Sequence, residues 1–228
     1  MKRRVTHTRP RTHESRTRIE QVSIAGPAGL IEGVLEFEPG SAASSVALVC
    51  HPHPLFGGTM HTKAVFRAAK AAVLEGLPAL RFNFRGVGQS QGAYDGGTGE
   101  RADAIGALDF LVSRYPGAQV CMMGFSFGSA VGLAVGAADD RVKALVGMGL
   151  PVKSYDYMYL SACEKPKLVV EGSEDQYGPR HLVAAVFERF APPKRLHWVE
   201  GADHFFTGHL DELVDTIRKF IRDAGLRL

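Results

Sequence analysis

Residues 119–130 read Gln-Val-Cys-Met-Met-Gly-Phe-Ser-Phe-Gly-Ser-Ala. An apolar run is followed by Gly-x-Ser-x-Gly and then by small residues, which predicts a buried strand, a sharp turn and a helix. Ser126 occupies the turn. A serine on such a strained strand-to-helix turn is presented at the end of a sheet, and the flanking glycines relieve clashes with neighbouring backbone. Ser126 is therefore a candidate nucleophile; the alternative is a serine that only caps the helix.

Apolar strand-like runs alternate with helix-like stretches on both sides of this turn. Strands that are apolar on both faces and separated by helices indicate an α/β fold with a parallel sheet covered on both faces. Two earlier runs flank a Gly-Pro-Ala-Gly turn and predict an antiparallel hairpin. The predicted strands lie near residues 18–24, 30–37, 46–50, 79–84, 119–123, 144–149, 167–171 and 195–199, and the predicted helices near 61–75, 100–114, 127–138, 178–190 and 207–224.

Length and composition indicate one globular domain, which we expect to span residues 18–228. Hydrophobic residues make up 45% and charged residues 22%, which excludes a disordered or fibrous chain. No run reaches the roughly 18 to 20 apolar residues of a membrane-spanning helix. The basic N-terminus is not followed by the apolar segment of a secretory signal. We therefore expect a cytoplasmic protein without membrane association.

The N-terminal residues 1–17 are predicted to form a basic arm. Residues 1–18 hold seven basic residues against one acid, Glu14, so the remainder is slightly acidic although the formal net charge is +3. Such an arm can bind nucleic acid or anionic surfaces, but a solvated, flexible tail is the simpler interpretation. Nothing downstream indicates nucleic-acid binding. We expect a monomer or a homodimer without a nucleic-acid partner.

Two later loops supply candidate partners for the serine. A serine hydroxyl needs a general base beside it. Where a Gly-x-Ser-x-Gly elbow carries the nucleophile, the acid and then the histidine follow it in the chain. Asp175 and His204 end Gly-x-x-Asp and Gly-x-x-His segments that each follow a predicted strand. Glu171 and Glu174 compete with Asp175, but the offset of Asp175 from the turn glycine leaves the chain room to bend over the sheet edge. These residues predict the triad Ser126, Asp175 and His204.

The loop after the first core strand is the expected source of an oxyanion donor. One donor is expected from the backbone N–H of Phe127, directly after the serine, and the second from this His-Pro-His-Pro-Leu-Phe-Gly-Gly loop. Pro52 and Pro54 have no N–H. The donor is then His53 or Leu55, of which we favour His53.

The histidines of the same loop permit a second interpretation. His51, His53 and nearby His61 could bind zinc together with a carboxylate or thiolate. The proline-constrained backbone and the absence of HExxH or CxxC argue against it. We expect no metal, and a buried, hydrogen-bonded His51 that braces the loop.

Four motifs stand out: HPHPLFGGTM at 51–60, RFNFRGVGQSQG at 81–92, GFSFG at 124–128 and GADHFF at 201–206. Together they resemble a family of small bacterial α/β hydrolases related to dienelactone-hydrolase-like proteins and small serine carboxylesterases. The resemblance implies an α/β-hydrolase fold, with an eight-stranded, mostly parallel sheet and helices on both faces. It also implies the triad above and esterase activity on small esters; no cofactor is implied. Dienelactone hydrolases proper carry cysteine at the position of Ser126, which argues against that reaction.

The glycine-rich part of the second motif could suggest a phosphate-binding loop after a strand. Its spacing fails G-x-G-x-x-G because position 91 is glutamine. We expect the loop to be structural, with Asn83 and Arg85 tying it to its neighbours.

Only residues 150–166 separate two predicted strands where larger lipases insert a helical lid, so we expect a minimal lid and small or short-chain ester substrates. Aromatic residues could line the pocket or pack against the sheet instead. The candidate pocket residues are Phe56, Phe125, Tyr155, Tyr159 and Phe206. The same triad also serves thioesterases, amidases and acyltransferases, and a non-catalytic scaffold is the alternative from another class.

Overall fold

The computed structural model describes residues 17–40 and 43–226. The basic arm predicted for residues 1–17 lies outside the described residues, except for Thr17.

One eight-stranded sheet runs through the described chain in the order β1-β2-β4-β3-β5-β6-β7-β8. β1 and β2 form the predicted antiparallel hairpin, and β2 pairs with β4 in antiparallel register. All other neighbours are parallel. The strands are β1 (Arg18–Gly26), β2 (Gly29–Phe37), β3 (Ser45–Cys50), β4 (Ala79–Phe82), β5 (Gln119–Phe125), β6 (Val142–Met148), β7 (Lys167–Gly172) and β8 (Lys194–Val199).

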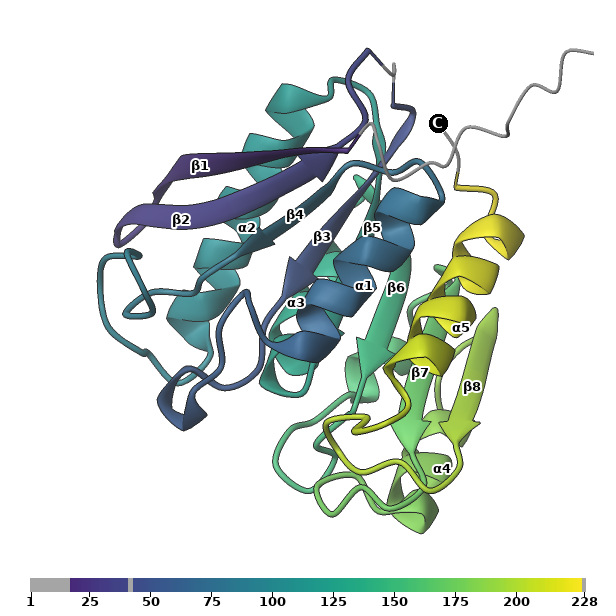
Figure 1. Ribbon diagram of the computed structural model, residues 1–228. Helices are drawn as coiled ribbons and strands as arrows, with labels where there is room; N and C mark the ends of the chain where they lie inside the picture. Colours follow the sequence, from purple (N-terminus) through teal and green to yellow (C-terminus); the bar gives the residue numbers. More distant parts are fainter. Residues whose placement is uncertain (1–16, 41–42, 227–228) are drawn as a thin grey trace, which may run out of the picture.

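Helices cover both faces of this sheet (Figure 1). α1 (Lys63–Leu74) and α5 (Leu210–Asp223) pack on one face, and α2 (Thr98–Arg114), α3 (Phe127–Ala138) and α4 (Arg180–Glu188) pack on the other. β3 and β7 are buried along their whole length, as their apolar runs predict, although β7 also buries Lys167 and Glu171. The predicted α/β-hydrolase fold, a mostly parallel sheet with helices on both faces, is confirmed.

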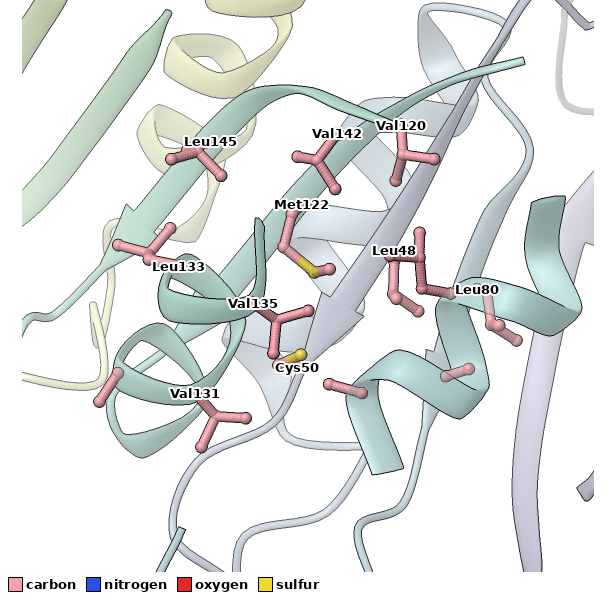
Figure 2. Packing of buried hydrophobic residues seen from close by; sticks show 14 of the residues in the cluster. Leu48, Cys50, Leu80, Val120, Met122, Val131, Leu133, Val135, Val142 and Leu145 are labelled. Atoms are coloured by element: carbon pink, nitrogen blue, oxygen red, sulfur yellow. The ribbon is translucent and has the colours of Figure 1, made fainter. Parts of the chain in front are cut away.

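α3 is the helix that follows the Gly-x-Ser-x-Gly turn, and it lies over the centre of the sheet. Its glycines let it approach β3, β5 and β6 closely, and Figure 2 shows Leu133 and Val135 beside side chains of those strands. Full burial of one such side chain contributes about 1.5 to 3 kcal/mol to folding. This packing seats the N-terminus of α3 at the end of β5.

One strand is shorter than its sequence suggests. β4 ends at Phe82, although residues 79–84 were predicted as a strand. The reason is a competing hydrogen bond, since the N–H of Phe84 donates to Nε2 of His51 instead of to a neighbouring strand (3.0 Å).

The connection between β6 and β7 contains only the short 3-10 helix η3 (Met158–Ser161). This is the minimal lid that its length predicts. Among the described residues, no helix combines the length and the apolar sequence that crossing a membrane requires.

Candidate active site

Four loops with unusual residues meet at one edge of the sheet. They follow β3, β5, β7 and β8 and carry His53, Ser126, Asp175 and His204. β3 lies between β4 and β5, so the chain turns in opposite directions from it. In open α/β sheets, ligands bind outside the carboxyl ends of the strands at such a switch point.

Ser126 adopts the strained backbone that its motif predicts. Its φ of 56° and ψ of −124° lie in a region of backbone conformation that residues other than glycine rarely occupy. Glycines make the turn possible by close approach. A Cβ atom on Gly124 would lie 2.2 Å from the carbonyl oxygen of Gly128, and one on Gly128 would lie 2.4 Å from that of Cys50. The Gly-x-Ser-x-Gly pattern is therefore required by backbone packing between β3, β5 and α3.

His204 stands between the serine and the acid. Its Nε2 lies 2.9 Å from Oγ of Ser126, and its Nδ1 lies 2.6 Å from Oδ2 of Asp175. His204 and Asp175 are buried, whereas Ser126 is half-buried and open to the cavity described below. The structure thus brings the three predicted triad residues into one hydrogen-bonded chain.

The carboxylate of Asp175 is held on both oxygens. Oδ1 accepts the backbone N–H groups of Tyr177 (2.7 Å) and Gly178 (3.1 Å), while Oδ2 faces His204. The competing Glu174 is exposed and turned away. Because two backbone N–H groups fix Oδ1, the carboxylate of Asp175 can orient the imidazole of His204 through Oδ2 and stabilise its protonated form.

The predicted oxyanion donors lie beside the serine. His53 and Phe127 line the same cavity as Ser126, and their rings are 5.0 Å apart. Leu55, the alternative donor, has its N–H engaged by Nδ1 of His53 (3.2 Å). Within the described chain, the N–H groups of His53 and Phe127 donate to no other group. Two backbone donors therefore remain available at the end of β3 and the start of α3.

His51 braces the loop, as expected from its buried position. Its Nδ1 pairs with the carbonyl of Pro52 (2.6 Å), and its Nε2 accepts the N–H of Phe84. Burial lowers the pKa of His51 to about 4, and the hydrogen bond to Pro52 opposes that shift only in part. Both ring nitrogens are occupied. In the described chain, no cluster of three or more His, Cys, Asp or Glu side chains is placed to hold a metal.

Asn83 and Arg85 tie the glycine-rich loop down, as predicted. Oδ1 of Asn83 accepts the N–H of Met60 (2.8 Å), and the guanidinium of Arg85 binds both oxygens of Asp103 (2.8 and 2.9 Å). The glycine-rich loop is thereby bound to the loop after β3, which contains Met60, and to α2.

Ser126 and His204 open into a cavity of about 340 Å³, near the lower end of the range for small-molecule sites. Neutral side chains and backbone line it; none of the described lining residues is Asp, Glu, Lys or Arg. Phe56 and Tyr155 are among the lining residues, as predicted, and 86% of Phe56 is exposed. The aromatic lining residues are Phe56, Phe127, Tyr155, Tyr177 and Phe205.

Three predicted pocket residues do not line the cavity, and their assignment is corrected. Phe125 is fully buried beneath His204, with ring centroids 5.1 Å apart, and Phe206 packs on Phe125 within the core. Tyr159 packs against Tyr157 and the core cluster under α3 and α4. These residues support the site from behind.

Tyr177 and Phe205 are lining residues that the sequence did not single out. Their rings flank His204 at centroid distances of 4.7 and 5.2 Å. Each lies within two residues of a triad member, Asp175 or His204, at the end of a strand. That adjacency is the signal that could have found them.

Comparisons with known proteins agree with this arrangement. Residues 51–219 match the family described as an alpha/beta hydrolase domain. A Rickettsia prowazekii (strain Madrid E) protein without a characterised function is 34% identical over 210 residues, which is 88% of each chain.

Two solved structures are similar over nearly the whole fold. An alpha-beta serine hydrolase homologue from Coxiella burnetii is 36% identical, covers 88% of this chain and 96% of its own, and superposes with a TM-score of 0.80. A lidless a/b serine hydrolase from Xanthomonas campestris is 30% identical, covers 90% and 94%, and has a TM-score of 0.82. The chain therefore belongs to the alpha/beta hydrolase domain family.

Proposed function

We propose that this chain is a serine hydrolase that cleaves small or short-chain carboxylic esters through an acyl-enzyme. The observation that carries the proposal is the hydrogen-bonded chain from Ser126 through His204 to Asp175, with the serine facing a cavity. A nucleophile, a base and an orienting acid within hydrogen-bond reach are the requirements of nucleophilic acyl transfer. No cofactor is needed for this chemistry.

In the first half of the reaction, Oγ of Ser126 attacks the ester carbonyl while Nε2 of His204, 2.9 Å away, takes the serine proton. The new imidazolium is stabilised by Asp175. It then donates the proton to the departing alcohol, which leaves an acyl group on Ser126. In the second half, His204 deprotonates a water molecule, which attacks the acyl-enzyme and releases the acid.

The negative charge on the carbonyl oxygen develops beside the backbone N–H groups of His53 and Phe127. The N-terminus of α3 points at the same place and favours negative charge. Loss of one such donor typically costs about 3 to 4 kcal/mol of transition-state stabilisation.

The cavity supports a preference for small, uncharged substrates. Its lining offers no charged side chain to pair with a charged substrate, and its volume of about 340 Å³ is modest. The segment between β6 and β7 adds no helical lid that could enclose a long acyl chain.

The test is hydrolysis of p-nitrophenyl esters from acetate to dodecanoate by the wild type and by Ser126→Ala. We expect activity to be highest on the short esters and to disappear in the variant. Activity that survives in Ser126→Ala would overturn the role of the serine. A wild type that is inactive on every ester, yet active on a thioester or an anilide, would replace the ester by that substrate class.

A further inference from the structure

Glu171 is a buried carboxyl beside the triad that the proposed reaction does not use. It is the last residue but one of β7 and is fully buried. One oxygen, Oε2, accepts the N–H of Leu150 (2.9 Å). The other, Oε1, has no hydrogen-bond partner among the described residues. A buried polar atom without a partner costs free energy, so this atom calls for an explanation.

Other buried carboxylates of the described chain are matched by more donors. Two face guanidinium groups, and a third accepts two backbone N–H groups. These are Glu36 with Arg81, Asp103 with Arg85, and Glu100 with the N–H groups of Asp95 and Gly97. Among the described residues, Glu171 is paired with one neutral donor, the N–H of Leu150, and with no cation. An ionised carboxylate in that position would be poorly compensated.

The nearest like charge is Asp175. Burial raises the pKa of Glu171 well above its usual range, and the negative charge of Asp175 raises it further. Two adjacent buried carboxyls do not both ionise readily, and the one with more donors keeps the charge. Asp175 has two backbone N–H groups and His204, so the proton belongs on Glu171.

We propose that Glu171 is a positioning residue that carries a proton at neutral pH and donates it in a hydrogen bond to the carboxylate of Asp175. The proton turns the partnerless oxygen into a donor, while the other oxygen keeps the N–H of Leu150. Glu171 then joins the loop that holds the triad acid to the loop after β6, which contributes Pro151 to the cavity. The positioning role rests on the proposed function, but the protonation does not.

The packing around Glu171 supports this link. A Cβ atom on Gly178 would lie 2.3 Å from Oε1 of Glu171 and 2.6 Å from the carbonyl oxygen of Leu150. Gly178 itself donates its N–H to Asp175. The loop that holds Asp175 therefore rests directly on the Glu171 carboxyl.

The titratable groups that surround Glu171 are few. Asp175 lies on the loop after β7, with His204 hydrogen-bonded to it on its far side, and Tyr157, which interacts electrostatically with Glu171, lies between β6 and η3. Burial raises the pKa of Tyr157 well above its usual range, and the hydrogen bond between its hydroxyl and Ser129 (2.7 Å) opposes that shift only in part, so Tyr157 stays neutral near pH 7. Asp175 is thus the only negative charge among these neighbours.

The first arm of the test measures protonation without using activity. Urea unfolding of the full chain is compared between the wild type and Glu171→Gln from pH 5 to pH 8. A carboxyl with a raised pKa binds more protons in the folded chain, so its stabilising effect is lost as pH rises. We expect the folding equilibrium constant of the wild type to fall, relative to the variant, by up to about tenfold per pH unit.

A matched control is Glu36→Gln, which neutralises a buried carboxyl that faces Arg81. We expect the pH-dependent fall in relative stability for Glu171→Gln and not for Glu36→Gln. If the ratio of the folding equilibrium constant of the wild type to that of Glu171→Gln stays constant from pH 5 to pH 8, Glu171 is ionised in the folded chain. That result would overturn the proposal.

The second arm measures positioning by the rate at which a fluorophosphonate labels Ser126 as a function of pH. Glutamine keeps both an acceptor and a donor, so we expect Glu171→Gln to label at the wild-type rate with its low-pH limb unmoved. Glu171→Leu removes the donor to Asp175 and is expected to label at least about tenfold more slowly. Equal rates for Glu171→Leu and the wild type would refute the positioning role.

The same profiles of labelling rate against pH also separate an effect of charge at Glu171 from an effect of its hydrogen bond. If Glu171 were ionised, removal of its charge in Glu171→Gln would shift the low-pH limb downward, because His204 would bind its proton less tightly. That shift would contradict the proposal. A wild type that is not labelled at all would refute the proposed function and the positioning role, while the unfolding arm would still decide the protonation of Glu171.

Discussion

Replacement of Asp175 by Asn tests how the acid controls His204. Oδ1 accepts two backbone N–H groups, and Oδ2 lies 2.6 Å from Nδ1 of His204. An amide can keep both backbone bonds only if its oxygen takes the Oδ1 position, because an NH₂ group there would face two donors. Its NH₂ group must then point at Nδ1 of His204.

This orientation forces the wrong tautomer of the imidazole. Nδ1 must accept a hydrogen bond, so the ring proton moves to Nε2, which faces Oγ of Ser126 at 2.9 Å. A protonated Nε2 cannot take the serine proton. We expect kcat to fall by roughly 10⁴, which corresponds to about 5.5 kcal/mol in the barrier. Although asparagine is closer in shape to aspartate than alanine is, we expect kcat of Asp175→Asn to be no higher than that of Asp175→Ala.

The assay is kcat/KM for p-nitrophenyl acetate, with thermal unfolding to show that each variant is folded. Glu174→Gln, one residue away and exposed, is the matched control and should stay within about twofold of the wild type. A folded Asp175→Asn that retains more than about a tenth of the wild-type kcat/KM would refute the tautomer argument.

Three further predictions concern packing, pH and the cavity. Gly128→Ala would place Cβ 2.4 Å from the carbonyl oxygen of Cys50, so we expect a loss of about 1 to 3 kcal/mol in urea unfolding; unchanged stability would contradict the close approach. Burial lowers the pKa of His51 to about 4, so between about pH 4 and pH 6.5 its imidazole is neutral in the folded chain but binds a proton in the unfolded chain. The wild type should therefore gain up to about 3 kcal/mol relative to His51→Gln as pH rises from about 4 to about 6.5, and a flat difference would refute this. Phe56→Ala should raise KM about threefold or more with an unchanged thermal midpoint, because Phe56 covers the cavity from an exposed position; a loss confined to kcat would contradict that role.

The triad could be predicted because its signals are local. Each of its residues follows an apolar run in a short turn, and parallel strands bring their carboxyl ends to the same edge of the sheet. Asp175 and His204 have the same offset from their turn glycines, and both lie where Ser126 can be reached. Local chemistry also narrowed the second oxyanion donor to His53 or Leu55, since proline has no N–H, but only the structure shows that the N–H of Leu55 is already engaged.

The pocket could not be predicted from the sequence because it depends on side-chain direction. Phe125 precedes Ser126, and its ring is directed into the core beneath His204. Phe205 and Phe206 are identical neighbours, yet Phe205 lines the cavity and Phe206 is buried. Phe206 also adopts a left-handed backbone, with φ of 55°, which nothing in its sequence indicates.

Glu171 illustrates a different limit of the sequence. From the sequence alone, Glu171 is only a competitor of Asp175 for the position of the triad acid. Its significance depends on a missing donor and on a neighbouring carboxylate, which are properties of the assembled site. Sequence spacing alone carries no information on either.

The most direct test of the nucleophile is the intact mass of the chain after reaction with a fluorophosphonate. We predict one covalent adduct on the wild type, mapped to Ser126 by peptide analysis, and none on Ser126→Ala. A wild type without an adduct, or an adduct of equal yield on Ser126→Ala, would contradict it.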